Sequence, residues 1–141
     1  VIVGEGPYLN FIKEYAKRIE CKRVQFVGRV IEGVSKYFLD ADVFVLPGLG
    51  GLSISDAMIH SLPVIVGDAD GTELDLVTAD TGFYIQNINT KDIYEKLKYL
   101  YENPANRDQM AKNAFINITS KYSFDSYYKS FKNSVHFVKS K

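Results

Sequence analysis

A glycine-rich corner is the part of this sequence whose residue types are best suited to chemistry. The apolar run 43–46 is typical of a buried strand, ends at Pro47, and is followed by Gly48, Gly50 and Gly51 before helical spacing begins at Leu52. Glycines let a backbone approach a ligand closely, and the first turn of a helix offers unpaired N–H groups and the positive end of its dipole. This glycine corner, residues 47–53, therefore predicts an anion site suited to a phosphate.

A carboxylate follows the corner on the same predicted helix. Asp56 lies one to two turns in, where its oxygens could reach the hydroxyls of a sugar attached to the phosphate. Diphosphate plus ribose is the ligand that this combination favours. The alternative is structural: glycine turns between a strand and a helix also occur for packing alone, with Asp56 as a solvated helix residue.

Composition limits the class of protein. A length of 141 residues, with 46% hydrophobic and 24% charged residues, is typical of one soluble globular domain. No apolar stretch approaches the roughly 20 residues of a membrane span and no basic head followed by an apolar run marks a signal peptide, so a cytoplasmic location is expected. Cys21 is expected to be a buried or half-buried thiol, His60 to be structural and His136 to lie in a solvated tail. These three residues give no metal-ligand spacing, so no metal is expected.

Charge is unevenly distributed along the chain. Residues 1–89 hold 7 Lys and Arg against 12 Asp and Glu, whereas residues 90–141 hold 10 against 5. The glycine corner lies in the acidic part, which argues against nucleic-acid binding because that function clusters Lys and Arg. The basic, tyrosine-rich tail could touch a membrane surface or a partner domain, or form a solvated helix face.

Strand and helix patterns alternate along most of the chain. Strands are expected at 1–3, 24–27, 43–46, 63–66 and 82–85, and helices at 7–20, 32–39, 52–61, 73–77, 92–101, 104–121 and 124–139. Apolar strands separated by helices predict an α/β fold with a doubly wound parallel sheet, followed by a helical tail over about 90–141. Thr90 and Ser123 are the expected N-caps, and Pro104 suits a first helical turn. The chain opens inside an apparent strand without a methionine, so we expect a fragment of a longer polypeptide with a single domain over 1–141.

Six segments occur in a familiar order and together resemble one family of enzymes. They are Val1-Ile-Val-Gly4-Glu-Gly6-Pro7, Val24-Gln-Phe-Val-Gly28-Arg29, Ala41-Asp-Val-Phe-Val-Leu-Pro47, Asp56-Ala-Met58, Ser61-Leu-Pro-Val64 and Thr81-Gly-Phe-Tyr84. The chain resembles, to about residue 124, the C-terminal domain of GT-B glycosyltransferases of the group 1 family, which are retaining enzymes. The resemblance implies a Rossmann-like fold forming half of a GT-B enzyme.

The resemblance also implies a role for particular residues. In such enzymes this domain binds the nucleotide of an activated sugar, and the glycine corner gives backbone N–H groups to the diphosphate. Asp56 stands where the family usually has a glutamate that holds the ribose, Arg29 and Val30 lie along the base, and Gly4 approaches from a neighbouring strand end. The implied donor-binding residues are Gly4, Arg29, Val30, Gly48, Leu49, Gly50, Gly51, Leu52, Ser53 and Asp56.

The sequence departs from the family pattern in two places. The family commonly has a second glutamate eight positions before Asp56, for the transferred sugar, but Gly48 stands there. Either backbone amides hold the sugar or another acid does so, and Asp68, Asp70 and Glu73 are the nearest candidates; these could equally be caps. The family's first strand–helix unit, which carries an Arg and a Lys for the diphosphate, is also missing. We therefore expect that residues outside this sequence supply the strand, that the sheet has closed up, or that another chain completes it.

The expected function is therefore transfer of a sugar from a nucleotide-sugar to an acceptor hydroxyl in polysaccharide, lipopolysaccharide or glycolipid biosynthesis. The donor is expected to be a UDP- or GDP-sugar, without metal or other cofactor. An N-terminal acceptor-binding domain is the expected partner, with peripheral contact at the inner face of the membrane, and no catalytic acid or base is assigned within this chain. The alternative is a non-enzymatic nucleotide- or sugar-phosphate-binding module.

Overall fold

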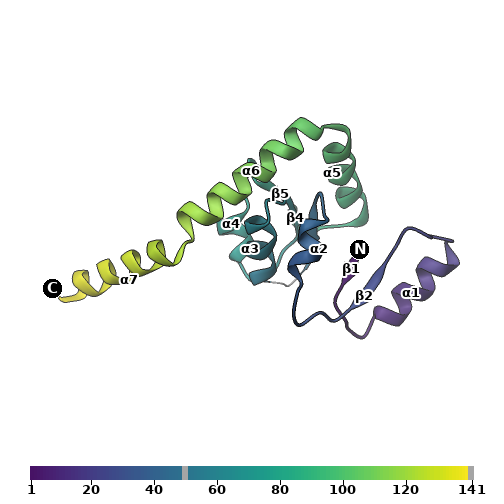
Figure 1. Ribbon diagram of the computed structural model, residues 1–141, viewed down its shortest axis with the longest axis horizontal. Helices are drawn as coiled ribbons and strands as arrows, with labels where there is room; N and C mark the ends of the chain where they lie inside the picture. Colours follow the sequence, from purple (N-terminus) through teal and green to yellow (C-terminus); the bar gives the residue numbers. More distant parts are fainter. Residues whose placement is uncertain (49–50, 140–141) are drawn as a thin grey trace. The chain divides into compact units, whose positions relative to one another are not determined.

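The computed structural model describes residues 1–48 and 51–139, which form two compact units, Val1–Asp40 and Ala41–Lys141 (Figure 1). The donor-site residues Leu49 and Gly50 lie outside the described residues. The expectation of one domain over 1–141 stays a prediction, and each unit is treated by itself below.

The first unit is a β-α-β crossover with one further helix. It contains β1 (Ile2–Val3), α1 (Leu9–Arg18), β2 (Phe26–Gly28) and α2 (Ser35–Leu39). The strands are parallel, with Ile2 opposite Phe26, and α1 forms the crossover connection that parallel strands need. Ala16 of α1 is buried, whereas Cys21, just after the helix, is exposed. The expectation of a buried or half-buried thiol is therefore wrong, because the chain after α1 turns out toward solvent.

The second unit contains a three-stranded parallel sheet with β4 at its centre. Its elements are β3 (Phe44–Leu46), α3 (Leu52–Ile59), β4 (Val64–Val66), α4 (Thr72–Leu76), β5 (Gly82–Tyr84), α5 (Thr90–Glu102), α6 (Pro104–Lys121) and α7 (Phe124–Lys139). Each strand is followed by a helix, so the predicted α/β class with parallel strands and C-terminal helices is confirmed.

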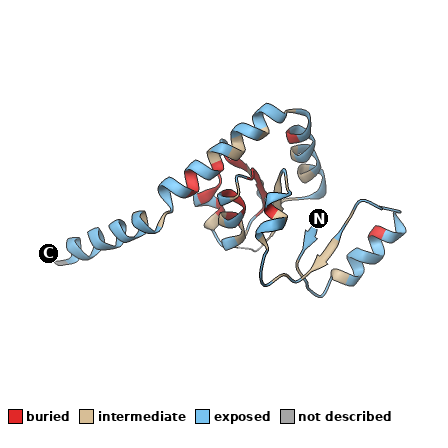
Figure 2. Cartoon of the chain, viewed as in Figure 1, coloured by how far each residue is buried: buried red, intermediate tan, exposed pale blue. Residues whose placement is uncertain are grey.

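The core of this unit gathers on β4 and on the helices that cover it (Figure 2). Every residue of β4 is buried, which explains why this strand reads as an uninterrupted Val-Ile-Val run. Ile54 and Met58 of α3 are fully buried, and α3 packs against α6. Gly82 allows β5 to approach β4, because a Cβ at this position would lie 2.1 Å from the carbonyl oxygen of Val64.

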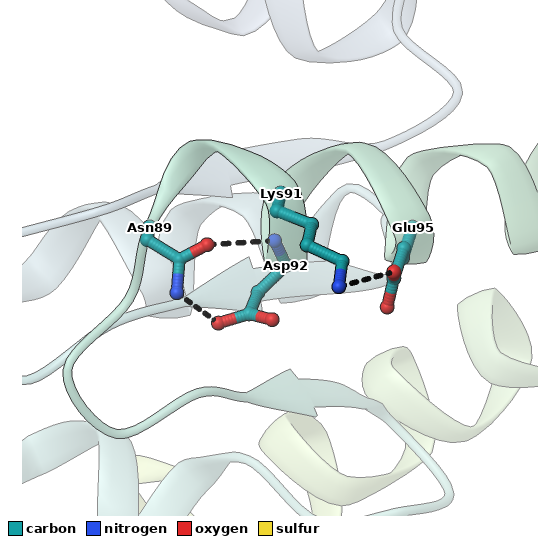
Figure 3. A network of polar contacts seen from close by, with 4 residues as sticks. All are labelled: Asn89, Lys91, Asp92 and Glu95. Atoms are coloured by element: carbon teal, nitrogen blue, oxygen red, sulfur yellow. Dashed lines mark hydrogen bonds and ion pairs between the residues drawn. The ribbon is translucent and has the colours of Figure 1, made fainter.

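The C-terminal helices begin with the capping residues that the sequence predicts, except that the N-cap of α5 lies one residue earlier. The N-cap of α5 is Asn89 rather than Thr90: its side-chain oxygen accepts the N–H of Asp92 at 3.1 Å (Figure 3). An asparagine one residue earlier competes well for the same role, and Thr90 becomes the first helical residue. Ser123 does accept an N–H, from Ser126 at 3.2 Å, and Pro104 opens α6 as predicted.

The last helix is exposed along most of its length (Figure 2). Its aromatic residues include Phe124, Tyr127 and Phe131, which are 79%, 69% and 59% exposed. Of the helices in the described ranges, none is long and apolar enough to cross a membrane.

Candidate functional site

The glycine corner joins β3 to α3, where the sequence placed an anion site. Gly51 immediately precedes α3 and has φ +36°, a value that L side chains rarely adopt. Within the described residues no side chain caps α3, in contrast to α5, which Asn89 closes. The N–H of Ile54, in the first turn of α3, donates to the carbonyl of Gly51 at 3.2 Å. Leu52, the first residue of α3, is 82% exposed, so the start of the helix faces solvent.

Asp56 lies on the solvent side of α3. The helix buries Ile54, Ala57 and Met58 on its other side. Among the described residues the Asp56 carboxylate has no hydrogen-bond or ion-pair partner, whereas its backbone carbonyl accepts the Nδ1–H of His60 at 2.6 Å. His60 thus closes the end of α3, in agreement with a structural role. The carboxylate itself is available to an external donor of hydrogen bonds.

The segment after β4 carries three acidic residues, and one of them, Glu73, accepts hydrogen bonds from the backbone of that segment. Its side chain is only 3% exposed, and its two oxygens accept the N–H groups of Ala69 and Gly71, each at 3.0 Å. A carboxylate with both oxygens bound in this way ties residues 69–71 to the start of α4. Glu73 therefore stabilises its own loop, in agreement with the alternative of a helix cap that the sequence left open.

Asp68 is held by the end of the neighbouring strand. It accepts the hydroxyl of Tyr84 at 2.5 Å and the N–H of Asn87 at 2.7 Å. The Tyr84 hydrogen bond, followed by that from Asn87, lowers the pKa of the Asp68 carboxyl, and the same bond raises the pKa of Tyr84. Asp68 therefore links the loop after β4 to the loop after β5.

Asp70 is the acid that lies beside the glycine corner. Its Oδ1 accepts the N–H of Thr72 at 3.1 Å, and its Oδ2 lies 3.4 Å from the position that a Cβ would take on Gly51. Hydrogen bonds from the side chain and backbone of Thr72 lower the pKa of Asp70, so the group is ionised at neutral pH. The second unit thus brings the Asp70 carboxylate close to Gly51, at the start of α3.

Three of the predicted donor-site residues belong to the first unit. Gly4, with φ +132°, donates its N–H to the carbonyl of Gly28 at 2.8 Å, so both lie where β1 and β2 end. Arg29 follows β2, and its Nη1 lies 3.4 Å from Oε1 of Glu5, with both side chains more than half exposed. Val30 is half-buried. Gly4, Arg29 and Val30 occupy the carboxyl ends of these strands, the edge that binds ligands in open parallel sheets.

The remaining predicted residues belong to the second unit. Gly48, Gly51, Leu52, Ser53 and Asp56 all lie between the end of β3 and the second turn of α3.

Sequence reasoning missed the support that α6 gives to these loops. Asn117 is buried and donates its Nδ2–H to the carbonyl of Leu76 at 3.1 Å, and the Tyr122 hydroxyl donates to the carbonyl of Asp75 at 2.7 Å. Both acceptors are at the end of α4. Asn117 lies on α6 and Tyr122 directly follows it, and neither residue type gave a signal for these contacts, because the partners are more than 40 residues away in the sequence.

The described ranges contain no group of three or more His, Cys, Asp or Glu that could hold a metal ion.

Comparison with solved structures places this fold among the C-terminal halves of GT-B glycosyltransferases. S. aureus TarM, in a complex with UDP, matches with a TM-score of 0.79 and 26% identity. The match covers 94% of this chain and 28% of the TarM chain. Anabaena HepE in complex with UDP has a TM-score of 0.78 at 19% identity, over 95% of this chain and 39% of its own, a likeness that concerns the fold alone.

The Glycosyl transferases group 1 family model matches residues 1–116, and the chain belongs to this family. A curated relative is the GDP-mannose-dependent monoacylated alpha-(1-6)-phosphatidylinositol monomannoside mannosyltransferase of Corynebacterium glutamicum, 25% identical over 136 residues. The match covers 89% of this chain and 35% of the relative, so the chain spans about a third of that enzyme's length.

Proposed function

We propose that this chain is the donor-binding part of a retaining, metal-independent hexosyltransferase that uses a UDP- or GDP-sugar. The glycine corner and the first turn of α3 hold the diphosphate through backbone N–H groups, and Asp56 accepts hydrogen bonds from the ribose hydroxyls. Arg29 and Val30 lie along the base and Gly4 borders the site. No residue of the chain is assigned as a general acid or base, so the 141 residues on their own are expected to bind donor without turnover.

The observation that carries this proposal is the geometry of the corner. A helix of eight residues begins directly after a glycine with φ +36° and has no side-chain cap within the described residues. A helix start that has no side-chain cap and lies next to a glycine suits a phosphate group. Family membership supports the same ligand, as does the UDP complex of TarM.

The wider context of the reaction is also part of the proposal. The acceptor would be a hydroxyl group of a polysaccharide, lipopolysaccharide or glycolipid, presented by an N-terminal domain of the same protein at the inner, cytoplasmic face of the membrane. The lipid substrate named for the Corynebacterium relative supports a lipid-linked acceptor. The exposed aromatic side chains of α7, together with Lys129 and Lys132, support peripheral contact with a membrane surface.

The proposal is tested by ligand-observed NMR of the full chain with UDP, GDP, ADP and TDP. We expect one nucleoside diphosphate to bind, and Asp56→Ala to weaken it about 10- to 100-fold. That range corresponds to the loss of hydrogen bonds to a charged group, about 1.5 to 3 kcal/mol. Asp125→Ala, which removes an acid from the first turn of α7, is the matched control and should bind as the parent does. Failure of all four nucleotides to bind the parent would refute the proposal.

A further inference from the structure

We propose that α7 is an interfacial helix that lies in the headgroup region of an anionic lipid bilayer, with one aromatic face toward the acyl chains and its lysines against the lipid phosphates. This inference rests on the proposed function for its purpose, because a lipid-linked acceptor would be met at such a surface. Its basis is the division of the side chains of α7 between an exposed apolar side and a basic side.

The apolar side of α7 runs along the whole helix. Its large side chains recur every three or four residues, with two tyrosines adjacent at one turn, so at 3.6 residues per turn they fall within an arc of about 100°. All of them are exposed, from 39% for Val135 to 79% for Phe124. A stripe of this kind suits a helix that binds along its length to an apolar surface. This aromatic face consists of Phe124, Tyr127, Tyr128, Phe131, Val135 and Val138.

The charges around the aromatic face complement an anionic partner. Residues 121–141 hold five Lys against a single Asp, without Glu or Arg. Lys132 is exposed and borders the aromatic face beside Tyr128, so its methylene stem can follow the apolar surface while its ammonium group reaches a phosphate. A second copy of the chain would bring the same lysines together, and like charges repel, whereas an anionic lipid surface attracts them.

The aromatic residue types also favour a bilayer interface over a protein partner. Tyr127 and Tyr128 are 69% and 56% exposed, and each combines an apolar ring with a polar hydroxyl group. In a dry protein interface each hydroxyl would need its own hydrogen-bond partner. At the boundary between acyl chains and headgroups, water and phosphate oxygens are available to both, which is why tyrosine is common at that depth.

Hydrogen bonds fix the start of α7 to the second unit. The Tyr122 hydroxyl donates to the carbonyl of Asp75 at 2.7 Å, and Oγ of Ser126 donates to the carbonyl of Ser120, at the end of α6, at 3.1 Å. Ser123, between the two helices, accepts the N–H of Ser126. A bilayer that binds α7 would therefore also hold the second unit beside the membrane surface.

The experiment uses tryptophan fluorescence, because the chain has no Trp of its own. Phe131→Trp places the reporter on the aromatic face, and Asn133→Trp, two residues further on, places it on the opposite side of the same helix. Each variant of the full chain is titrated with vesicles of phosphatidylcholine and with vesicles of equal parts phosphatidylcholine and phosphatidylglycerol. We expect the emission of Phe131→Trp to move to shorter wavelength with the anionic vesicles alone, and that of Asn133→Trp to stay unchanged.

Further substitutions in the Phe131→Trp chain separate the two contributions. Lys129→Gln combined with Lys132→Gln should lower the partition coefficient for anionic vesicles about 30-fold, at the strength with which such a surface attracts nearby lysines. Tyr128→Ser should lower it about tenfold by removing buried apolar area. Lys91→Gln combined with Lys98→Gln is the matched control, since it removes two exposed charges from α5 and should leave the partition coefficient unchanged.

Several outcomes would overturn the inference. They are equal binding to both kinds of vesicle, equal shifts of the two Trp reporters, and an equal loss in the α5 control. A shift of Phe131→Trp that needs no vesicles and grows with protein concentration would overturn it too, because a second copy would then cover the aromatic face. No nucleotide is needed for these measurements, so failure of the nucleotide panel refutes donor binding alone, and absence of vesicle binding refutes this inference alone.

Discussion

Replacing Glu73 tests whether the loop beside the glycine corner is built as described. The Glu73 side chain is 3% exposed and accepts two backbone N–H groups at 3.0 Å. In Glu73→Ala both donors lose their acceptor. Ala69 is half-buried, so its unsatisfied N–H costs about 1 to 3 kcal/mol, whereas the exposed Gly71 recovers a hydrogen bond to water and costs little.

Loss of the buried Cγ methylene group adds about 1 kcal/mol. We therefore expect Glu73→Ala to lower the free energy of unfolding by about 2 to 4 kcal/mol. Glu73→Gln should cost less, about 1 to 2 kcal/mol, because one oxygen still accepts while the amide NH₂ faces the other N–H donor.

The assay is urea unfolding followed by circular dichroism, with amide hydrogen exchange at Ala69 and Gly71 as the local measurement. Both amides should exchange faster in Glu73→Ala. Glu95→Ala is the matched control: its side chain is 56% exposed and its oxygen lies 3.9 Å from Nζ of Lys91, so a change below about 0.5 kcal/mol is expected (Figure 3).

One result would refute the reasoning about Glu73. Suppose that Glu73→Ala unfolded at the same urea concentration as the parent but bound a nucleotide-sugar no more tightly than the nucleoside diphosphate. Glu73 would then contact the sugar and would not stabilise the loop. Asp70 would then lose the support on which its placement depends.

Two further predictions concern the sheet and its edge. Gly82→Ala should destabilise the second unit by about 3 kcal/mol or more, because the added Cβ would lie 2.1 Å from the Val64 carbonyl oxygen, whereas Gly6→Ala, with open space around it, should change the unfolding midpoint little. Tyr84→Phe should reduce stability at neutral pH by removing the hydrogen bond to Asp68. The pKa of Asp68 is lowered from 3.8, so the difference in stability from the parent should disappear when the pH falls below 3.8 and Asp68 becomes protonated. The pKa of Tyr84 is raised from 10.0, so the difference should also disappear when the pH rises above 10.0 and Tyr84 loses its proton. Equal pH profiles for parent and variant would contradict the assigned bond.

The element order was predictable from local pattern. Every strand and helix expected from the sequence occurs, with ends that differ by a few residues, because an apolar β-branched run and helical spacing are properties of adjacent residues. The shift of the α5 cap to Asn89 shows the limit of such reasoning. Asn89 and Thr90 are both good caps, and which of them takes the role depends on the path by which the chain leaves β5.

Glycine types and spacing were sufficient to predict the turn between β3 and α3, and its role as a phosphate site stays a prediction. They did not distinguish the three acids after β4. Asp68, Asp70 and Glu73 are near neighbours in the sequence, yet one accepts a tyrosine hydroxyl, one faces Gly51 and one is buried in its own loop. Exposure of Cys21 was likewise beyond the pattern, since it depends on where the chain turns after α1.

Local chemistry thus decided the strands and the helices of this group 1 glycosyltransferase chain, and it predicts a phosphate site at the glycine corner. Only the packing of β4 between β3 and β5 decided which carboxylate reaches that corner. The physical reason is that the carboxyl ends of parallel strands meet at one edge of the sheet, so loops from separate parts of the sequence become neighbours there. A hydrogen bond between such loops, like that of Tyr84 to Asp68, has no signature in the spacing of residues along the chain.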